Sequence, residues 1–87
     1  MASYRIEFKA SVAKDFKLIP KHHVQRIMQA IEELKLEPRP ANAAKLSAQE
    51  RYRLRVGRYR VLYEIVDSTL LITVVKVAHR KRTYRGA

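Results

Sequence analysis

Hydrophobic and polar residues alternate at the start of the chain, and the period then lengthens to that of a helix. Tyr4, Ile6 and Phe8 alternate with charged neighbours, which predicts a strand with one face on a core. Apolar residues then recur at helical spacing in two stretches, which end before Pro20 and Pro38 because proline interrupts a helix. The first part of the chain therefore predicts a strand followed by a helical hairpin.

The second half of the chain has the pattern of strands. Residues 39–50 are irregular in pattern and rich in alanine, and we expect them only to link the helices to these strands. Alternation then resumes, with a tight turn at Gly57-Arg58 and another near Asp67. The three predicted strands are 51–56, 59–66 and 70–78.

This order of elements, strand, helix, helix, strand, strand, strand, is typical of the α+β class. We expect a three-stranded antiparallel meander in a sheet that carries both helices on one face, which leaves the other face open. A chain of 87 residues buries too little surface for two independent cores, so we expect one domain over residues 1–87.

Charge is the strongest bias in the composition. Nineteen Lys and Arg against eight Asp and Glu give a formal charge of +11, which favours an anionic partner such as RNA, DNA, an acidic protein or an anionic membrane. The absence of cysteine excludes disulfides, thiolate metal sites and cysteine nucleophiles, and no motif indicates a metal or a cofactor. The longest apolar run, Leu70 to Val75, is too short to cross a bilayer, so we expect a cytoplasmic protein without a membrane partner.

Four arginines share the open face of the predicted hairpin. A two-residue turn sets Arg55 opposite Arg60, and directly opposed residues point to the same side of a sheet. Opposed like charges destabilise a strand pair, so we interpret this gathering as an anion site. The alternative is that these side chains are only the solvated side of a half-buried sheet. The members of this arginine face are Arg51, Arg53, Arg55 and Arg60.

The last strand and the tail extend the candidate site. Unbroken alternation puts Val75, Val77 and His79 on the arginine face as well, whereas a β-bulge would reverse that placement. The tail over residues 80–85 is basic and carries Tyr84. Such a tail is either a solubilising segment or one that binds phosphates and stacks on a base.

The second half of the chain resembles a known protein family. The resembling run extends from Lys45 to Arg85 and reads KLSAQERYRLRVGRYRVLYEIVDSTLLITVVKVAHRKRTYR. With the preceding strand and helical hairpin, the resemblance covers nearly the whole chain. Its segment YRLRVGRYRVLYEI is characteristic of the RelE/ParE toxin superfamily, and its ending VAHRKRTY resembles the RelE rather than the ParE branch. We therefore expect residues 1–87 to form a RelE-like toxin domain.

The resemblance implies the toxin of a type II toxin–antitoxin system. Its implied activity is ribosome-dependent, metal-independent cleavage of mRNA in the A site of the 30S subunit, which inhibits translation. The implied partners are a cognate antitoxin, the ribosome and mRNA, and no cofactor is expected.

The resemblance also implies roles for individual residues. Basic residues on the second and third strands would hold the scissile phosphate, Arg80 would stabilise charge in the transition state, and Tyr84 would stack on a base or relay a proton. Arginine stays protonated and is a poor base, so His79 is the candidate proton acceptor. The predicted catalytic residues are Arg55, Arg60, His79, Arg80 and Tyr84, and the predicted RNA-binding residues are Arg51, Arg53, Arg58, Lys81 and Arg82.

Two other functions fit the same sequence. A ParE-like toxin would bind DNA gyrase and cut nothing, on the same fold with a similar arginine hairpin. A non-catalytic RNA-binding module would need only the charge. The end of the chain favours the nuclease, because a binder has no need of a histidine, an arginine and a tyrosine around one phosphate.

Overall fold

The computed structural model describes residues 3–46 and 50–81. Over these residues the predicted order of strands and α-helices is confirmed, with one added strand. The helices and strands are β1 (Arg5–Phe8), α1 (Ala10–Lys17), α2 (Lys21–Glu33), β2 (Ala43–Lys45), β3 (Arg51–Val56), β4 (Tyr59–Val66), η1 (Asp67–Thr69) and β5 (Leu71–His79). The addition is β2, because residues 39–50 were expected to be irregular. None of the described helices is long and apolar enough to cross a membrane.

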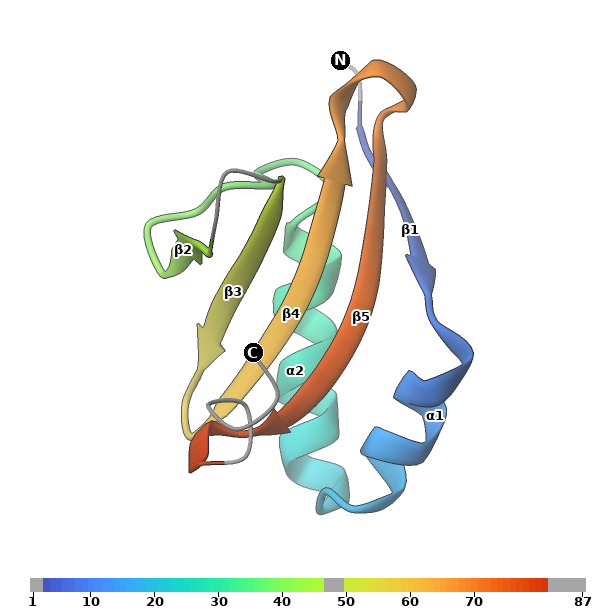
Figure 1. Cartoon of the computed structure of the whole chain (residues 1–87). Coiled ribbons are helices and arrows are strands. Elements are labelled where there is room, and N and C mark those ends of the chain that lie inside the picture. The colour runs from blue at the N-terminus through green and yellow to red at the C-terminus, as the bar shows by residue number, and fades with distance from the viewer. Residues whose placement is uncertain (1–2, 47–49, 82–87) are drawn as a thin grey trace.

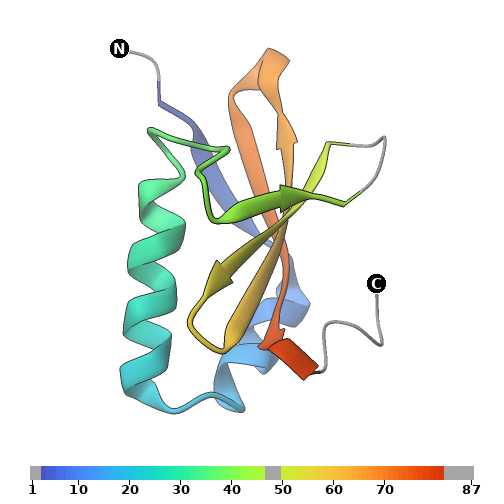
Figure 2. The same ribbon diagram turned by 90° about the vertical axis from the view of Figure 1, so that its left-hand side faces the viewer.

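The described strands form one sheet in the order β1-β5-β4-β3-β2 (Figure 1). The meander of β3, β4 and β5 is antiparallel, as predicted, while β1 pairs in parallel with β5 and β2 pairs antiparallel with β3. Figure 2 shows α2 lying along one side of the sheet. The α+β class predicted from the sequence is thus confirmed.

The hydrophobic core lies between both helices and one face of the sheet. Val12 of α1 and Ile27 and Ile31 of α2 are almost completely buried against the strands. The sheet residues that the alternation assigned to this face are all buried: Leu54, Val56, Val61, Tyr63 and Ile65. Burying each such aliphatic side chain stabilises the fold by about 1.5–3 kcal/mol, so this one face holds the two layers together.

A β-bulge interrupts the pairing of β4 with β5. Leu62 pairs with Lys76, but the next residue, Tyr63, pairs with Val74, which leaves Val75 without an opposite residue. One extra residue in a strand reverses the alternation of side chains beyond it.

The bulge overturns the predicted placement of the end of β5. Unbroken alternation put Val77 and His79 on the arginine face, but Val77 is buried in the core and His79 pairs with Tyr59 on the helix-facing side. Lys76 and Ala78 occupy the arginine face in their place, because they pair with residues whose side chains point there.

The edge of β5 is completed by a side chain of α1 where β1 ends. Pairing with β1 reaches only as far as Phe8 opposite Val74. Beyond it, the carboxylate of Asp15 accepts a hydrogen bond from the backbone N–H of Val77 at 3.0 Å. The helix therefore supplies an acceptor that a longer strand would otherwise provide.

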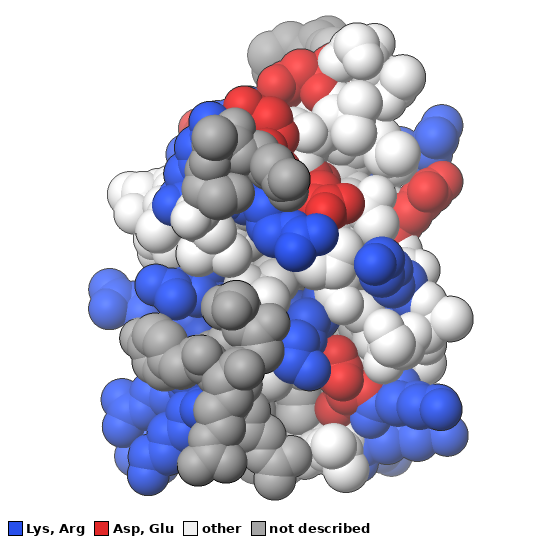
Figure 3. Space-filling model, in the orientation of Figure 1, with Lys and Arg blue, Asp and Glu red and all other residues white. Residues whose placement is uncertain are grey.

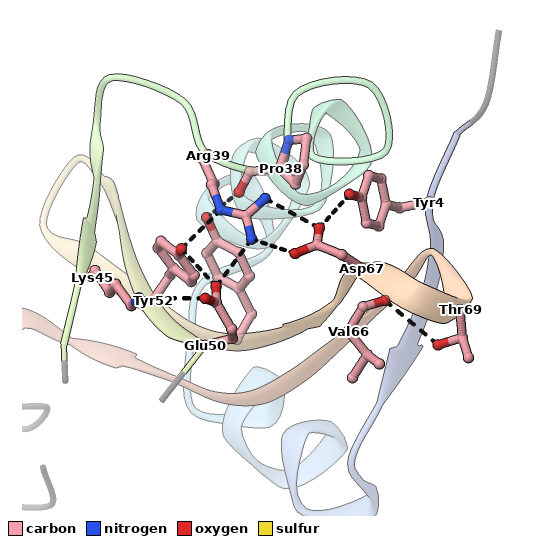
Figure 4. A network of polar contacts seen from close by, with 10 residues as sticks. Tyr4, Pro38, Arg39, Lys45, Glu50, Tyr52, Val66, Asp67 and Thr69 are labelled. Carbon is pink, nitrogen blue, oxygen red and sulfur yellow. Dashed lines mark hydrogen bonds and ion pairs between the residues drawn. The ribbon is translucent and has the colours of Figure 1, made fainter. Parts of the chain in front are cut away.

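At the far end of the sheet, the guanidinium of Arg39 joins the loop after α2 to two further segments (Figure 4). Its Nε donates to the hydroxyl of Tyr52 at 2.8 Å, and its Nη2 donates to Glu50 at 3.0 Å and to Asp67 at 2.8 Å. The hydroxyl of Tyr4 donates to the same Asp67 at 2.6 Å, so these contacts also reach the residue just before β1. We call these five residues the Arg39 network.

The Arg39 network lowers the pKa values of its two carboxyl groups. Hydrogen bonds from Arg39 are the main cause that holds the pKa of Glu50 below 4.5 and that of Asp67 below 3.8. The hydroxyls of Tyr52 and Tyr4 add to the effect, because a donor stabilises the ionised carboxylate. Both carboxylates are thus charged partners of Arg39 at neutral pH.

We expect Asp15→Ala to lower the free energy of unfolding by about 1–3 kcal/mol, because the half-buried N–H of Val77 then lacks an acceptor. Asp15→Asn keeps a side-chain carbonyl at the same place and should lose clearly less. Denaturant unfolding of both variants measures the difference. Equal losses in the two variants would show that the charge of Asp15, rather than this hydrogen bond, matters.

We expect Arg39→Gln to flatten the dependence of stability on pH in acid. A carboxyl group with a lowered native pKa stabilises the fold above its unfolded pKa, and this stabilisation is lost as the pH falls through the native value. The native protein should therefore lose stability from about pH 5 downward, and Arg39→Gln should lose less over that range because its carboxyl groups titrate nearer their ordinary values. Thermal unfolding midpoints between about pH 2 and pH 7 test this, and parallel curves would contradict it.

Candidate functional site

The face of the sheet that turns away from the helices carries the arginines of β3 and β4. The register sets Arg55 opposite Arg60, as predicted. Figure 3 looks onto this face and shows basic side chains spread across it, with several acidic side chains toward the end where η1 lies. The arginine face is thus a structural feature, and its charge is not evenly distributed.

An ion pair offsets part of the charge at one end of the arginine face. Arg51 donates through Nε to the carboxylate of Glu64, which lies opposite it on β4, at 3.1 Å. Arg53 and Arg55 follow toward the β3–β4 turn, where they face Leu62 and another arginine. Like charges of the face are therefore directly opposed near the turn.

A hollow of about 270 Å³ lies between the segment that enters β2 and these arginines. Residues before and within β2 line it on one side, and arginines of β3 and β4 line it on the other. Its lining residues are Ala41, Asn42, Ala43, Ala44, Arg53, Arg55 and Arg60. A space of this shape admits a small anionic group such as a phosphate among several guanidinium donors.

The backbone around the hollow is held by local hydrogen bonds. Asn42 accepts a bond from the N–H of Arg55 at 3.0 Å through its carbonyl, and donates from its side chain to the carbonyl of Arg55 at 2.8 Å. Arg60 donates through Nη1 to the carbonyls of Gly57 at 3.0 Å and Tyr59 at 2.9 Å. These contacts hold the backbone at Arg55 and the guanidinium of Arg60.

The turn and the residues after β5 lie beside one another. Arg58 is exposed in the turn, and its carbonyl accepts a hydrogen bond from the N–H of Arg80 at 2.7 Å. Lys81 follows and is exposed. The structure therefore brings Arg80 next to the hairpin end of the arginine face, while the predicted residues Arg82 and Tyr84 lie outside the described residues.

His79 is not brought onto the arginine face. Its ring meets the ring of Tyr59 edge to face on the helix-facing side, with 5.7 Å between the centroids. Its Nδ1 accepts a hydrogen bond from the N–H of Lys81 at 3.4 Å. The predicted group of Arg55, Arg60 and His79 around one point is thus divided between two faces at the end of the sheet.

Two residues near the site were missed by the sequence reasoning. Lys76 is one of them, and it lies on the arginine face. The sequence held a signal for this placement, because unbroken alternation would put Lys76 in line with Ile72 and Val74, facing the core. Burying an unpaired ammonium is costly, so the pattern itself required a bulge. Asn42 was missed because the short strand β2 has no alternation to reveal it.

No three His, Cys, Asp or Glu side chains are grouped so as to hold a metal ion within residues 3–46 and 50–81. The grouped charges of the site are instead cationic. The described residues offer a set of fixed guanidinium donors around a small space, and such a set binds and polarises an anion.

Comparisons with known proteins agree on one family of toxins. The model of a family described as the ParE toxin of type II toxin–antitoxin systems, parDE, matches residues 6–84. The curated Toxin RelE3 of Methanocaldococcus jannaschii is 33% identical over 86 residues, which cover 92% of this chain and 94% of the relative. The Putative toxin RelE1 of the same organism is 28% identical over 87 residues, which cover 95% and 97%.

Solved structures with similar folds include RelE toxins bound to antitoxins. An archaeal RelE–RelB complex from Pyrococcus horikoshii has a TM-score of 0.82 at 30% identity, covering 91% of this chain and 97% of the matched chain. A RelB–RelE complex from Methanococcus jannaschii has a TM-score of 0.74 at 31% identity, covering 92% and 96%. The similarity thus extends over almost the whole of each chain.

We expect Arg55→Gln to raise the free energy of unfolding by about 0.2–1 kcal/mol, because it removes a like charge opposite Arg60. The gain should shrink as salt is added, since salt screens exposed charges. Arg5→Gln, which changes an exposed arginine 3.6 Å from Glu7 on β1, is the matched control and should bring no gain. Denaturant unfolding at low and high salt measures the free energies of both variants. A loss of stability in Arg55→Gln would contradict a repulsion between Arg55 and Arg60.

Proposed function

Because the chain belongs to the RelE/ParE family of type II toxins, we propose that it is a ribosome-dependent, metal-independent endoribonuclease that cleaves mRNA in the ribosomal A site. The observation that carries this proposal is the hollow in the arginine face, which three arginines line together with small residues. The curated relatives and the solved structures named above are RelE proteins, which supports the RelE rather than the ParE activity.

Arg53, Arg55 and Arg60 bind the phosphate at the point of cleavage in this proposal. A guanidinium presents its N–H donors in a planar fork that matches the oxygens of a phosphate. Donors already fixed in place stabilise the charge that develops on the phosphorane, and this is commonly the largest contribution to catalysis. The bonds of the Arg60 guanidinium to the carbonyls of Gly57 and Tyr59, at 3.0 Å and 2.9 Å, support such a fixed donor.

The residues around the turn bind the flanking RNA and add charge to the transition state. Arg80, held beside the turn through its N–H, is assigned the stabilisation of negative charge on the transition-state phosphate. Arg58 and Lys81 are exposed nearby and are assigned to the RNA backbone. The family resemblance assigns Arg82 to RNA binding and Tyr84 to stacking or proton relay, and both lie outside the described residues.

Proton transfer is the step that the arginines do not perform, because a guanidinium stays protonated. Metal-free cleavage needs a base for the 2′-hydroxyl and an acid for the 5′-oxygen. We assign these roles to His79 and Tyr84. Since His79 is the last residue of β5 and faces the helix side, the reacting ribose must lie at the end of the sheet rather than over its centre.

The partners follow from the same proposal. Solved relatives are complexes of RelE with RelB, which supports a cognate antitoxin for this chain. The formal charge of +11 favours a partner segment rich in acidic residues, and it equally favours ribosomal RNA and mRNA.

A second candidate function is inhibition of DNA gyrase without any cleavage. One observation favours it: the family model that matches the chain is described as the ParE toxin. A gyrase inhibitor of this fold would use the arginine face for protein contacts, and proton transfer by His79 or Tyr84 would have no role.

The nuclease proposal is tested in a reconstituted translation system stalled with an open A site. We expect cuts within the A-site codon only when ribosomes are present, detected by mapping mRNA 5′ ends. Arg60→Ala and Arg80→Ala should each slow cleavage by about 10²- to 10³-fold, because each removes a donor to the transition state. Arg5→Ala, with the same loss of charge on β1, should cleave at the native rate.

The outcomes separate the two candidates. Intact mRNA in this system, together with inhibition of gyrase supercoiling by the same preparation, would overturn the nuclease and support the ParE activity. Equal slowing by Arg5→Ala and Arg60→Ala would reduce the role of the hollow to net charge. Circular dichroism of each variant confirms that it is folded.

A further inference from the structure

Four aromatic rings form a continuous row on the helix-facing side of the β3–β4 turn. The centroids of His22 and His23, in the first turn of α2, lie 4.1 Å apart. The next distances are 5.2 Å from His23 to Tyr59 and 5.7 Å from Tyr59 to His79. The fold thus gathers all three histidines of the chain around one tyrosine, although 56 residues separate His23 from His79.

Tyr59 stands between two grooves that have the same kind of lining. One, of about 290 Å³, lies between His23 and Tyr59, with Arg26 and Arg58 beside it. The other, of about 500 Å³, lies between Tyr59 and His79, with Lys76 and Lys81 beside it and with the carboxylate of Asp15, which accepts from the N–H of Val77, also in its lining. Each groove therefore combines ring surfaces with nearby cations, on a floor that includes buried aliphatic side chains of the core.

The ring of His23 contributes surface rather than charge to this row. Partial burial lowers its pKa, and the nearby His22, Arg26 and Arg58 lower it further, because each disfavours an additional positive charge. The arginines beside His23 therefore supply the positive charge there.

This combination fits unpaired nucleic acid better than the other anions that the charge would attract. Single strands bind where aromatic rings stack on bases and cations meet phosphates. An acidic peptide would use the cations and gain little from the rings. A lipid surface would need a broad exposed apolar area, whereas His23, Tyr59 and His79 are only partly exposed.

The row also continues directly from the arginine face. Arg60 follows Tyr59 in β4, points to the opposite side of the sheet, and donates to the carbonyl of Tyr59 at 2.9 Å. An RNA strand held at the hollow therefore reaches the rings by passing around the β3–β4 turn, where Arg58 is exposed.

We propose that His22, His23 and Tyr59, with Arg26 and Arg58, form a second RNA-binding surface on which unpaired bases stack, one base entering each groove beside Tyr59. The inference rests on the proposed function only in taking RNA as the ligand. It assigns no bond-breaking step to these five residues, which bind the strand on one side of the point of cleavage, while His79 at the end of the row keeps the proton transfer proposed above.

The experiment compares binding of two short oligonucleotides without ribosomes, by fluorescence anisotropy. One is an unstructured RNA, and the other has the same length and phosphates but abasic sugars. We expect the native chain to bind the RNA more tightly than the abasic strand. The double variant His22→Ala/His23→Ala should bind RNA about tenfold more weakly and the abasic strand unchanged, since stacking needs bases.

The controls make this result specific to the rings. Measurement at about pH 8, where free histidine is uncharged, keeps the charge of the variants equal to that of the native chain. The double variant His22→Phe/His23→Phe restores ring surface and should restore RNA binding. Arg55→Ala should weaken binding of both oligonucleotides alike, because its guanidinium meets phosphate.

Either of two outcomes overturns the proposal. One is equal affinity of the native chain for RNA and for the abasic strand. This result would show that the rings only pack against one another and that binding is purely electrostatic. The other is an equal loss for both strands in the alanine variant. Because the assay contains no ribosome and measures no cleavage, it gives its answer whether or not the chain proves to be a nuclease.

Discussion

The two-residue turn between β3 and β4 determines which side chains reach each face of the sheet. Gly57 adopts φ of 58°, a left-handed conformation that glycine reaches without strain, and this sets Val56 directly opposite Tyr59. A slip of one residue would exchange the two faces of a strand, placing Arg55 in the core and Leu54 in water. The buried side chains therefore enforce the register, and the register in turn opposes Arg55 to Arg60. The candidate site is a consequence of how the core is packed.

The two ends of the same hairpin differ in their electrostatics. At the η1 end, cations meet carboxylates: Arg39 binds Glu50 and Asp67, and Arg51 binds Glu64. These pairs add little individually, but the pairs of Arg39 share one guanidinium, which ties the start of β3 and η1 to the loop after α2. At the turn end, Arg55 lies opposite Arg60, and such opposed like charges cost stability. The fold thus joins opposite charges at one end of the hairpin and sets like charges opposite each other at the other end.

The sequence predicted those features that depend on periodicity over several residues. The class, the helical hairpin, the turn at Gly57 and the opposition of Arg55 to Arg60 all follow from alternating or helical patterns. It failed where one residue changes the pattern, since Val75 in the bulge moves His79 to the helix side and Lys76 to the arginine face. It also missed β2, whose three residues are too few to show a period. The hollow depends on β2 and on Asn42, so its arginines were predictable while its shape was not.

The division of the candidate site between two faces limits what kind of RNA can occupy it. The arginine face and the ring row lie on opposite sides of a sheet in a molecule of 34 × 26 × 25 Å. A ligand that touches Arg60 on one side and Tyr59 on the other must turn sharply around the hairpin end. Nucleic-acid duplexes resist bending on so short a scale, whereas an unpaired strand with separated bases does not. If both surfaces bind one RNA, the selection of unpaired RNA follows from the path between them, and no side chain has to read the sequence of bases.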